Sequence, residues 1–389
     1  MTTLSAEECA TLGSSVRAAC ARLLPDHRLR AVAYDAPAPG ERGFDRPLWA
    51  ALCSQVGVAE IGIPANLDDG GWGVAAQAVI AHELGRVLAP VPFLPSAVLT
   101  TRLLSTVDDA TELLGNLGQG HQTAAFAVTT RDGRFDGADL PLATDRSGRW
   151  RLSGSVRHVL GAAGADRIVV VATSDGHPQL YLVEREQQGV TVTAQPVLDA
   201  TRPMAVVDLE DAVAEPLPVI GSVVERIDQS LMHTIAVLTA EQVGAAERVL
   251  EMSVEYSGVR KQFDRPIGSF QAIKHRCADM LVELEMARSA SMAAVAAVDA
   301  ASPEAPWLVS MAKAVCSETL RNAAHSNLQI HGGIGFTWEH AAGLYVKRAR
   351  TDEVLFGLPT THWERVAESM ALVGGYQRDT DTDGVVAAS

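Results

Sequence analysis

Two long stretches with helical spacing meet at a short break, and this arrangement constrains the fold more than any other feature of the chain. Residues 225–262 and residues 269–300 repeat apolar side chains at the period of an α-helix. Pro266 and Gly268 lie between them; proline cannot continue a helix, and glycine tolerates the backbone of a turn. The pattern predicts two long neighbouring helices joined by a connection that presents side chains to a ligand.

The rest of the chain predicts an order of helices, then strands, then helices. Residues 1–120 have mainly helical spacing, and residues 121–221 hold short β-branched or aromatic runs separated by turn residues. Residues 222–375 return to the helical period, and residues 376–389 have the composition of a disordered tail. We therefore expect an α+β fold with an N-terminal helical domain, a middle antiparallel β-barrel or sandwich, and a C-terminal four-helix bundle.

Composition excludes several classes of protein. The net charge is -15 without a polybasic run, which argues against nucleic-acid binding through phosphates. No stretch of 18 uncharged apolar residues exists, so we expect no membrane span. The acidic N-terminus lacks the apolar core of a signal peptide, and the five cysteines form no Cys-x-x-Cys motif. We expect a cytoplasmic protein without a disulfide framework or a metal site.

Two polar clusters are candidates for ligand binding. In the first, Arg260 offers a fork for phosphate, Gln262 an amide and Phe263 a stacking face. An ordinary helix C-terminus is the alternative interpretation. The second cluster is the glycine-rich segment 329–336, whose backbone a ligand could approach closely. A tight turn between two helices would explain the same glycines.

Glu241 is the candidate for a general base. Apolar or small residues surround it on the long helix, and burial raises a carboxyl pKa toward the range useful for proton abstraction. An ion pair with an arginine is the alternative, because most partly buried acids are paired structurally. We interpret His275 as a packing residue rather than a catalyst.

These motifs together resemble the acyl-CoA dehydrogenase family over nearly the whole chain. Residues 260–280 resemble the family's signature segment, and residues 329–336 resemble its C-terminal glycine motif. Residues 61–64, 70–73 and 82–85 match its N-terminal lobe. The resemblance implies an FAD-dependent tetramer that removes the α-proton of an acyl-CoA thioester while the β-hydride passes to flavin N5. Electron-transferring flavoprotein is then the expected electron acceptor.

The resemblance also assigns roles to both polar clusters. It implies that Arg260, Gln262 and Phe263 hold the adenosine diphosphate end of an FAD bound mainly by a neighbouring subunit. It also implies that Gln329, Gly332 and Gly333 contact the same cofactor. The family's usual catalytic glutamate falls here on Phe356 or Gly357, neither of which can take a proton. The alternative position for the base, on the long helix, falls on Thr234, with Glu241 two turns further on.

Two flavin-holding segments of the family also depart from its pattern. The loop of the β domain that normally reads Thr-Glu-Pro-Gly-x-Gly-Ser-Asp is shortened to residues 129–133, and the Trp-Ile-Thr segment is replaced by residues 158–160. The resemblance therefore indicates a non-catalytic subunit of a heterotetrameric acyl-CoA dehydrogenase, of the type found in actinobacterial steroid side-chain degradation. Two alternatives remain: an active homotetramer that uses Glu241, and a structural subunit without flavin.

Overall fold

The computed structural model describes residues 5–34, 43–63 and 73–374. The predicted disordered tail at 376–389 and the glycines at 70–71 lie outside these residues. Helices make up the first third of the chain, as expected: α1 (Ala6–Leu23), α2 (Asp26–Tyr34), α3 (Arg46–Val56), α4 (Gly73–Arg86), the π-helix η2 (Phe93–Thr100), α5 (Thr101–Leu104) and α6 (Thr111–Gly118).

The middle of the chain forms a sheet that closes on itself. Its strands are β1 (Ala124–Ala127), β2 (Thr130–Arg131), β3 (Arg134–Phe135), β4 (Leu142–Asp145), β5 (Trp150–Leu160), β6 (Arg167–Ser174), β7 (His177–Glu184), β8 (Val190–Ala194) and β9 (Met204–Leu217). The pairing order β6-β4-β5-β9-β7 returns to β6, while β1 and β8 extend the sheet and β2–β3 forms a separate hairpin.

The prediction of a purely antiparallel barrel is right only in part, because two pairings are parallel. β1 and β4 each run parallel to β6, whereas β4–β5, β5–β9, β6–β7, β7–β9 and β8–β9 are antiparallel. The alternating burial of β9 gives the sheet one face directed toward a core made mainly of alanine and valine side chains.

The C-terminal part is helical but contains more than four helices. It consists of α7 (Val223–Val259), β10 (Lys261–Gln262), β11 (Arg265–Pro266), the 3-10 turn η3 (Ile267–Ser269), α8 (Gln271–Asp299), α9 (Ala305–His331), the 3-10 turn η4 (Gly332–Phe336), α10 (Ala342–Val354) and α11 (Pro359–Gly374). α7, α8 and α9 pack pairwise, and α10 and α11 pack against α9.

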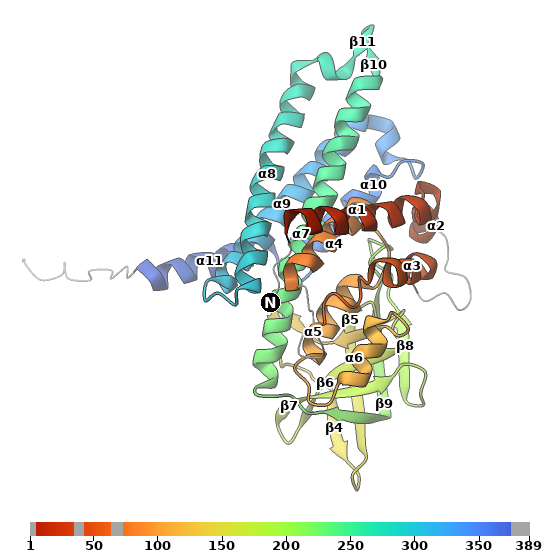
Figure 1. Ribbon diagram of the computed structural model, residues 1–389, viewed down its shortest axis with the longest axis vertical. Helices are drawn as coiled ribbons and strands as arrows, with labels where there is room; N and C mark the ends of the chain where they lie inside the picture. Colours follow the sequence, from red (N-terminus) through yellow and green to blue (C-terminus); the bar gives the residue numbers. More distant parts are fainter. Residues whose placement is uncertain (1–4, 35–42, 64–72, 375–389) are drawn as a thin grey trace, which may run out of the picture.

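The long helix α7 connects the β sheet to the far end of the helical bundle and contacts helices of both helical regions. It extends from the sheet, past α4, to the β10–β11 hairpin at the opposite end of the structure (Figure 1). Its middle section, Ile235–Ala246, is almost continuously buried, because the N-terminal helices, α9 and α10 cover it on different sides. Among the described residues, no helix is long and apolar enough to cross a membrane.

Candidate functional site

The first polar cluster lies on an exposed hairpin at one end of the bundle (Figure 1). α7 ends just before Arg260, and the chain reverses through Phe263 and Asp264, both with left-handed backbone angles (φ 52° and 61°). Such a turn suits the twist of a two-residue hairpin, although phenylalanine adopts it at a steric cost. The Phe263 side chain is 87% exposed, and its ring lies 6.1 Å from that of Phe270. The hairpin therefore presents Arg260, Gln262 and Phe263 outward.

The second cluster lies where α9 ends. Gly332 has a φ of 58°, which lets the chain turn into η4, and Gln329 and Gly333 are exposed. The imidazole of His331, between them, stacks on the Tyr256 ring at 4.3 Å. Because Tyr256 is one turn before Arg260, this contact shows that both clusters lie at the same end of the bundle.

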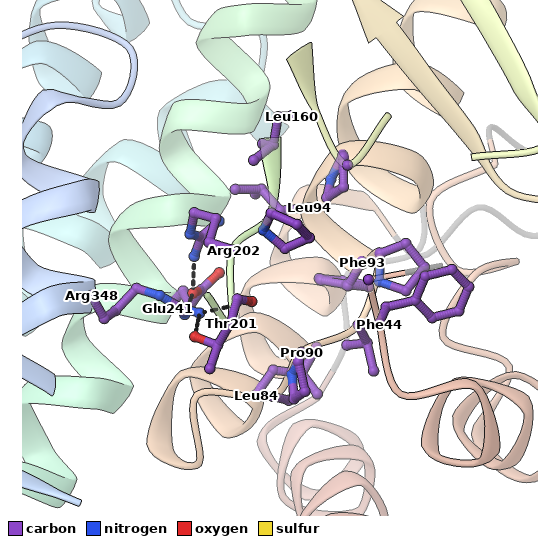
Figure 2. Close-up of a pocket in the computed structure, with 17 residues that line it drawn as sticks. Phe44, Leu84, Pro90, Phe93, Leu94, Leu160, Thr201, Arg202, Glu241 and Arg348 are labelled. Atoms are coloured by element: carbon purple, nitrogen blue, oxygen red, sulfur yellow. Dashed lines mark hydrogen bonds and ion pairs between the residues drawn. The ribbon is translucent and has the colours of Figure 1, made fainter. Parts of the chain in front are cut away.

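Glu241 lies in a buried ion-pair cluster (Figure 2). Its carboxylate accepts hydrogen bonds from Arg202 and from Arg348, the latter at 2.5 Å. Arg348 also pairs with Asp199 at 2.5 Å, and Arg202 lies 3.1 Å from Asp352. Burial raises the pKa of Asp352 to about 6, although the two arginines act in the opposite direction. This is the ion-pair arrangement that the sequence left open, and a catalytic role for Glu241 stays a prediction.

The cavity that Glu241 lines is small and mostly apolar (Figure 2). Its volume is about 40 Å³, and Phe93, Leu94 and Leu160 form much of its wall. Ligand pockets usually measure roughly 300 Å³ or more. This cavity has no room for a flavin ring, and Leu160, from the segment that replaces Trp-Ile-Thr, adds apolar bulk to it.

The β2–β3 hairpin covers the turn at Phe356 and Gly357, where the resemblance predicts the family's base position. Phe356 is buried with a φ of 59°, and Gly357 follows with a φ of 105°. Gly133, at the tip of the hairpin, is packed so tightly against the Phe356 carbonyl group that a side chain there would clash. The Phe135 amide donates to Asp228 Oδ1 at 2.8 Å and ties the hairpin to α7.

A cavity of about 330 Å³ remains beside this hairpin, lined by Gly133, Ile235 and His362 among others. Thr234, the alternative position for a base, is fully buried and donates its hydroxyl to the Ser230 carbonyl oxygen at 2.7 Å. A threonine so engaged is a poor proton acceptor.

Two buried residues that hold the Phe356 turn were missed at the sequence level. Lys313 Nζ donates to the Asp352 carbonyl oxygen at 2.9 Å and to that of Gly357 at 3.3 Å. Burial lowers the pKa of Lys313 to about 8. His362 Nε2 lies 2.9 Å from the Phe356 carbonyl oxygen, and burial lowers its pKa to about 4. The sequence signal that could have identified Lys313 is its place among the apolar positions of the helix that covers residues 305–331.

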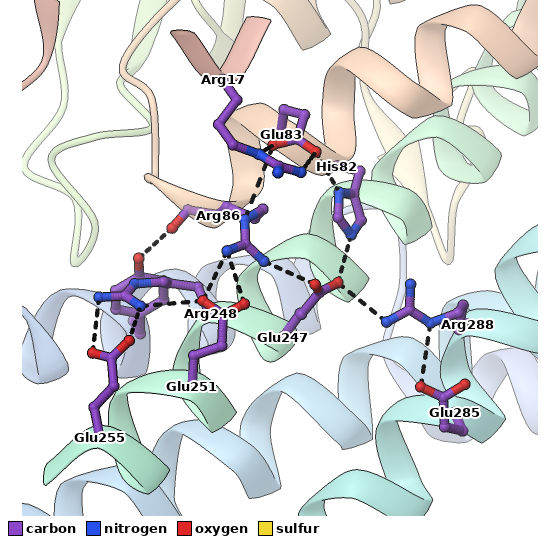
Figure 3. Close-up of polar contacts among 11 residues, drawn as sticks. Arg17, His82, Glu83, Arg86, Glu247, Arg248, Glu251, Glu255, Glu285 and Arg288 are labelled. Atoms are coloured by element: carbon purple, nitrogen blue, oxygen red, sulfur yellow. Dashed lines mark hydrogen bonds and ion pairs between the residues drawn. The ribbon is translucent and has the colours of Figure 1, made fainter. Parts of the chain in front are cut away.

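A second charged network joins the N-terminal helices to α7 (Figure 3). His82 lies 2.9 Å from Glu247 and 3.4 Å from Glu83, and Arg17 pairs with Glu83 at 2.7 Å. Burial lowers the pKa of His82, but the two carboxylates outweigh burial and raise it above its ordinary value. Arg86 adds pairs with Glu247 and Glu251. The opposite charges in this network pair with one another and link the N-terminal helices to α7.

Comparison with known proteins identifies the family to which the chain belongs. The family model described as acyl-CoA dehydrogenase, C-terminal domain, matches residues 224–371. Acyl-CoA dehydrogenase IpdE2 of Mycobacterium tuberculosis is 37% identical over 335 residues, which cover 83% of this chain and 89% of that protein. The chain therefore belongs to the acyl-CoA dehydrogenase family. Members of this family are oxidoreductases, and their cofactor is FAD.

Two solved structures share the fold at moderate identity. A chain of the ChsE4-ChsE5 complex from Mycobacterium tuberculosis is 28% identical, with a TM-score of 0.81, over 95% of this chain and 99% of that one. A chain of a Tcur3481-Tcur3483 steroid ACAD variant is 25% identical, with the same TM-score and the same coverage. Both structures are complexes of two named proteins.

The residues present fit only one part of FAD. The exposed hairpin and the α9 terminus offer cationic, amide and aromatic groups of the kind that a nucleotide needs. The cavity beside Leu160 cannot hold the flavin ring, as its volume shows. Among the described residues, no group of three or more His, Cys, Asp or Glu side chains could hold a metal ion.

Proposed function

We propose that this chain is a cofactor-sharing, non-catalytic subunit of a heterotetrameric acyl-CoA dehydrogenase. The observation that carries the proposal is the turn at Phe356 and Gly357. This turn has no proton acceptor at the family's base position, and the β2–β3 hairpin is packed against it through Gly133. A chain built in this way needs another subunit for proton abstraction.

The exposed half of the site supports the same proposal. Arg260, Gln262 and Phe263 lie on a hairpin that no other described part of the chain covers, and Gln329 lies exposed at the same end. Phosphate recognition by an arginine fork and stacking on an aromatic face do not require a complete nucleotide fold in one chain. In this proposal these residues, with Gly332 and Gly333, hold the adenosine diphosphate end of an FAD whose ring lies in the partner subunit.

The proposed reaction of the assembly is α,β-dehydrogenation of an acyl-CoA thioester in lipid or steroid side-chain catabolism, in the cytoplasm. The likeness to a steroid ACAD and to the ChsE4-ChsE5 complex supports the substrate class and the two-protein assembly. Reduced flavin would pass its electrons to an electron-transferring flavoprotein. The residues of this chain would bind the cofactor and complete the interface, while the proton and hydride transfers occur at the partner.

Expression of the chain alone and together with a candidate partner tests the proposal. We expect the chain alone to lack both flavin absorbance and acyl-CoA turnover, and the pair to show both. Flavin-loaded chain that turns over acyl-CoA alone would contradict the proposal. Flavin-free, active pairs would contradict the cofactor-sharing role, and a pair without flavin or activity would favour a purely structural subunit.

A second candidate function is an active homotetramer in which Glu241 is the base. Its supporting observation is the buried Glu241 carboxylate on the wall of the small cavity. Against it, the guanidinium groups of Arg202 and Arg348 both donate to Oε1 of that carboxylate, which is the structural ion pair of the alternative interpretation. If Glu241→Gln abolished turnover in a folded homotetramer, this second function would be preferred.

A further inference from the structure

Three aromatic side chains form a continuous stack at the end of the bundle that carries both polar clusters. The His331 ring lies between the rings of Tyr256 and His340, with a centroid distance of 4.3 Å to each. The interplanar angles are 24° with Tyr256 and 40° with His340. The three residues come from the last turn of α7, the end of α9 and the segment before α10. The stack therefore joins three parts of the chain that are distant in sequence.

Both polar clusters are attached directly to this stack. The Tyr256 carbonyl oxygen accepts a hydrogen bond from the Arg260 amide at 2.9 Å, where α7 ends at the first cluster. His331 belongs to the second cluster, and a Cβ atom at Gly335 would lie 3.1 Å from the His331 Cβ, so η4 folds closely over this histidine. Because Tyr256 and His331 stand on different helices, their contact sets the spacing of the two clusters.

Hydrogen bonds to the backbone fix the tautomer of each imidazole. Nδ1 of His331 lies 2.9 Å from the Asn327 carbonyl oxygen, which can only accept, so this nitrogen carries the proton. Nδ1 of His340 accepts the Ala342 amide at 3.1 Å, so the proton of that ring is on Nε2. A second proton on His340 would occupy Nδ1 and break its bond to the Ala342 amide. The stack is therefore built for a neutral His340.

The surroundings favour the neutral form of both rings. Burial lowers the pKa of His340, and His331 and Arg30 act in the same direction, whereas Asp26 raises it. Burial also lowers the pKa of His331, against the effect of its bond to Asn327. The three rings line a cavity of about 530 Å³, whose other charged lining groups are Asp26, Arg86, Arg248, Glu255 and Glu339. The two arginines on this wall pair with carboxylates of α7.

We propose that His331 and His340 are positioning residues for the shared FAD, because their stack on Tyr256 holds the two clusters at the spacing that the cofactor requires. The inference rests on the proposed cofactor-sharing function. Neither histidine takes part in proton or hydride transfer. Since a proton favours the open rings, the stack is fully stable above the ordinary histidine pKa of 6.5 and weakens as the pH falls below that value. Acid should therefore speed the release of FAD.

The test measures FAD release from the complex purified through a tag on this chain in its native host. His340→Ala removes the outer, half-buried ring and leaves Tyr256 and His331 in place. His177→Ala is the matched control, since His177 is an exposed histidine on β7. On dilution at about pH 7.5, flavin fluorescence should recover about two- to tenfold faster for His340→Ala than for wild type, because one aromatic pair is lost. The control should release FAD at the wild-type rate.

A second variant separates positioning by the stack from a general loss of stability. His340→Phe keeps a ring at this place but cannot take up a proton. It should release FAD at nearly the wild-type rate at about pH 7.5, and it should lose much of the acceleration that wild type shows at about pH 5.5.

Two results, each with flavin content intact, would overturn the inference and leave the proposed function standing. One is release from His340→Ala at the wild-type rate, and the other is an equal acceleration by acid in wild type and His340→Phe. A native complex that contains no flavin would overturn both the inference and the proposed function.

Discussion

The packing of the β2–β3 hairpin on the Phe356 turn can be tested by adding one methyl group at Gly133. A Cβ atom there would lie 3.0 Å from the Phe356 carbonyl carbon and closer still to its oxygen, and the φ of 77° is already unfavourable for alanine. The left-handed conformation costs about 1 kcal/mol. Displacing the hairpin also breaks the hydrogen bond from the Phe135 amide to Asp228, which contributes about 1–2 kcal/mol at this half-buried position.

Gly133→Ala should therefore lower the free energy of local opening of the hairpin by about 2–3 kcal/mol in total. Since about 1.4 kcal/mol corresponds to a tenfold change, the Phe135 amide should exchange its hydrogen roughly 30- to 140-fold faster. Hydrogen exchange with mass spectrometry over residues 129–137 measures this directly.

Gly148→Ala is the matched control. Gly148 has a φ of 80° with no atom within 4 Å of the added Cβ, so it shares the backbone cost and lacks the clash. Exchange at the Phe135 amide should stay at the wild-type rate in this control. Equal exchange rates in the two variants would refute the packing of the hairpin on the turn.

Three other substitutions test the remaining parts of the site. Glu241→Gln should destabilise the chain by about 3 kcal/mol in urea unfolding, because it leaves buried guanidinium charge unpaired; unchanged stability with lost turnover would instead indicate a base. Gly357→Glu should gain no acyl-CoA turnover in a dye-reduction assay and should lower the melting temperature, because a Cβ there lies 2.9 Å from the Asp132 carbonyl carbon. The raised pKa of His82 adds stability that is full below about pH 6.5 and is lost as pH rises through the folded value. His82→Gln should therefore lower the melting temperature at about pH 6 and much less at about pH 9; an equal loss at both would contradict the ion pairs with Glu247.

Helical periodicity predicted the C-terminal fold well, because long amphipathic helices repeat one signal over many residues. The helix predicted at 225–262 is observed at Val223–Val259, and that predicted at 269–300 at Gln271–Asp299. The π-helix at Phe93–Thr100 was not predicted, because its wider turn depends on backbone bonds between residues five apart, such as that from the Thr101 amide to the Ser96 carbonyl oxygen. The β2–β3 hairpin was missed because two-residue strands leave no alternating pattern.

The candidate site divides in the same way. The two exposed clusters could be identified from sequence because each consists of near neighbours along the chain. The ion pairs of Glu241 could not be predicted from sequence, because Arg202 and Arg348 are 39 and 107 residues away along the chain. The groove between α8 and α9, lined by Arg276 and Gln329 among others, could not be predicted either, because its walls belong to two different helices. Contacts between distant segments depend on the packed fold and carry no local signal.

The composition of the native complex tests the central claim most directly. Native mass spectrometry of the assembly purified through this chain gives the identity of its subunits and the number of flavins they hold. The proposal predicts unlike chains with one FAD for each pair, released when the partner is removed. An assembly of identical chains with one FAD for each chain would contradict it.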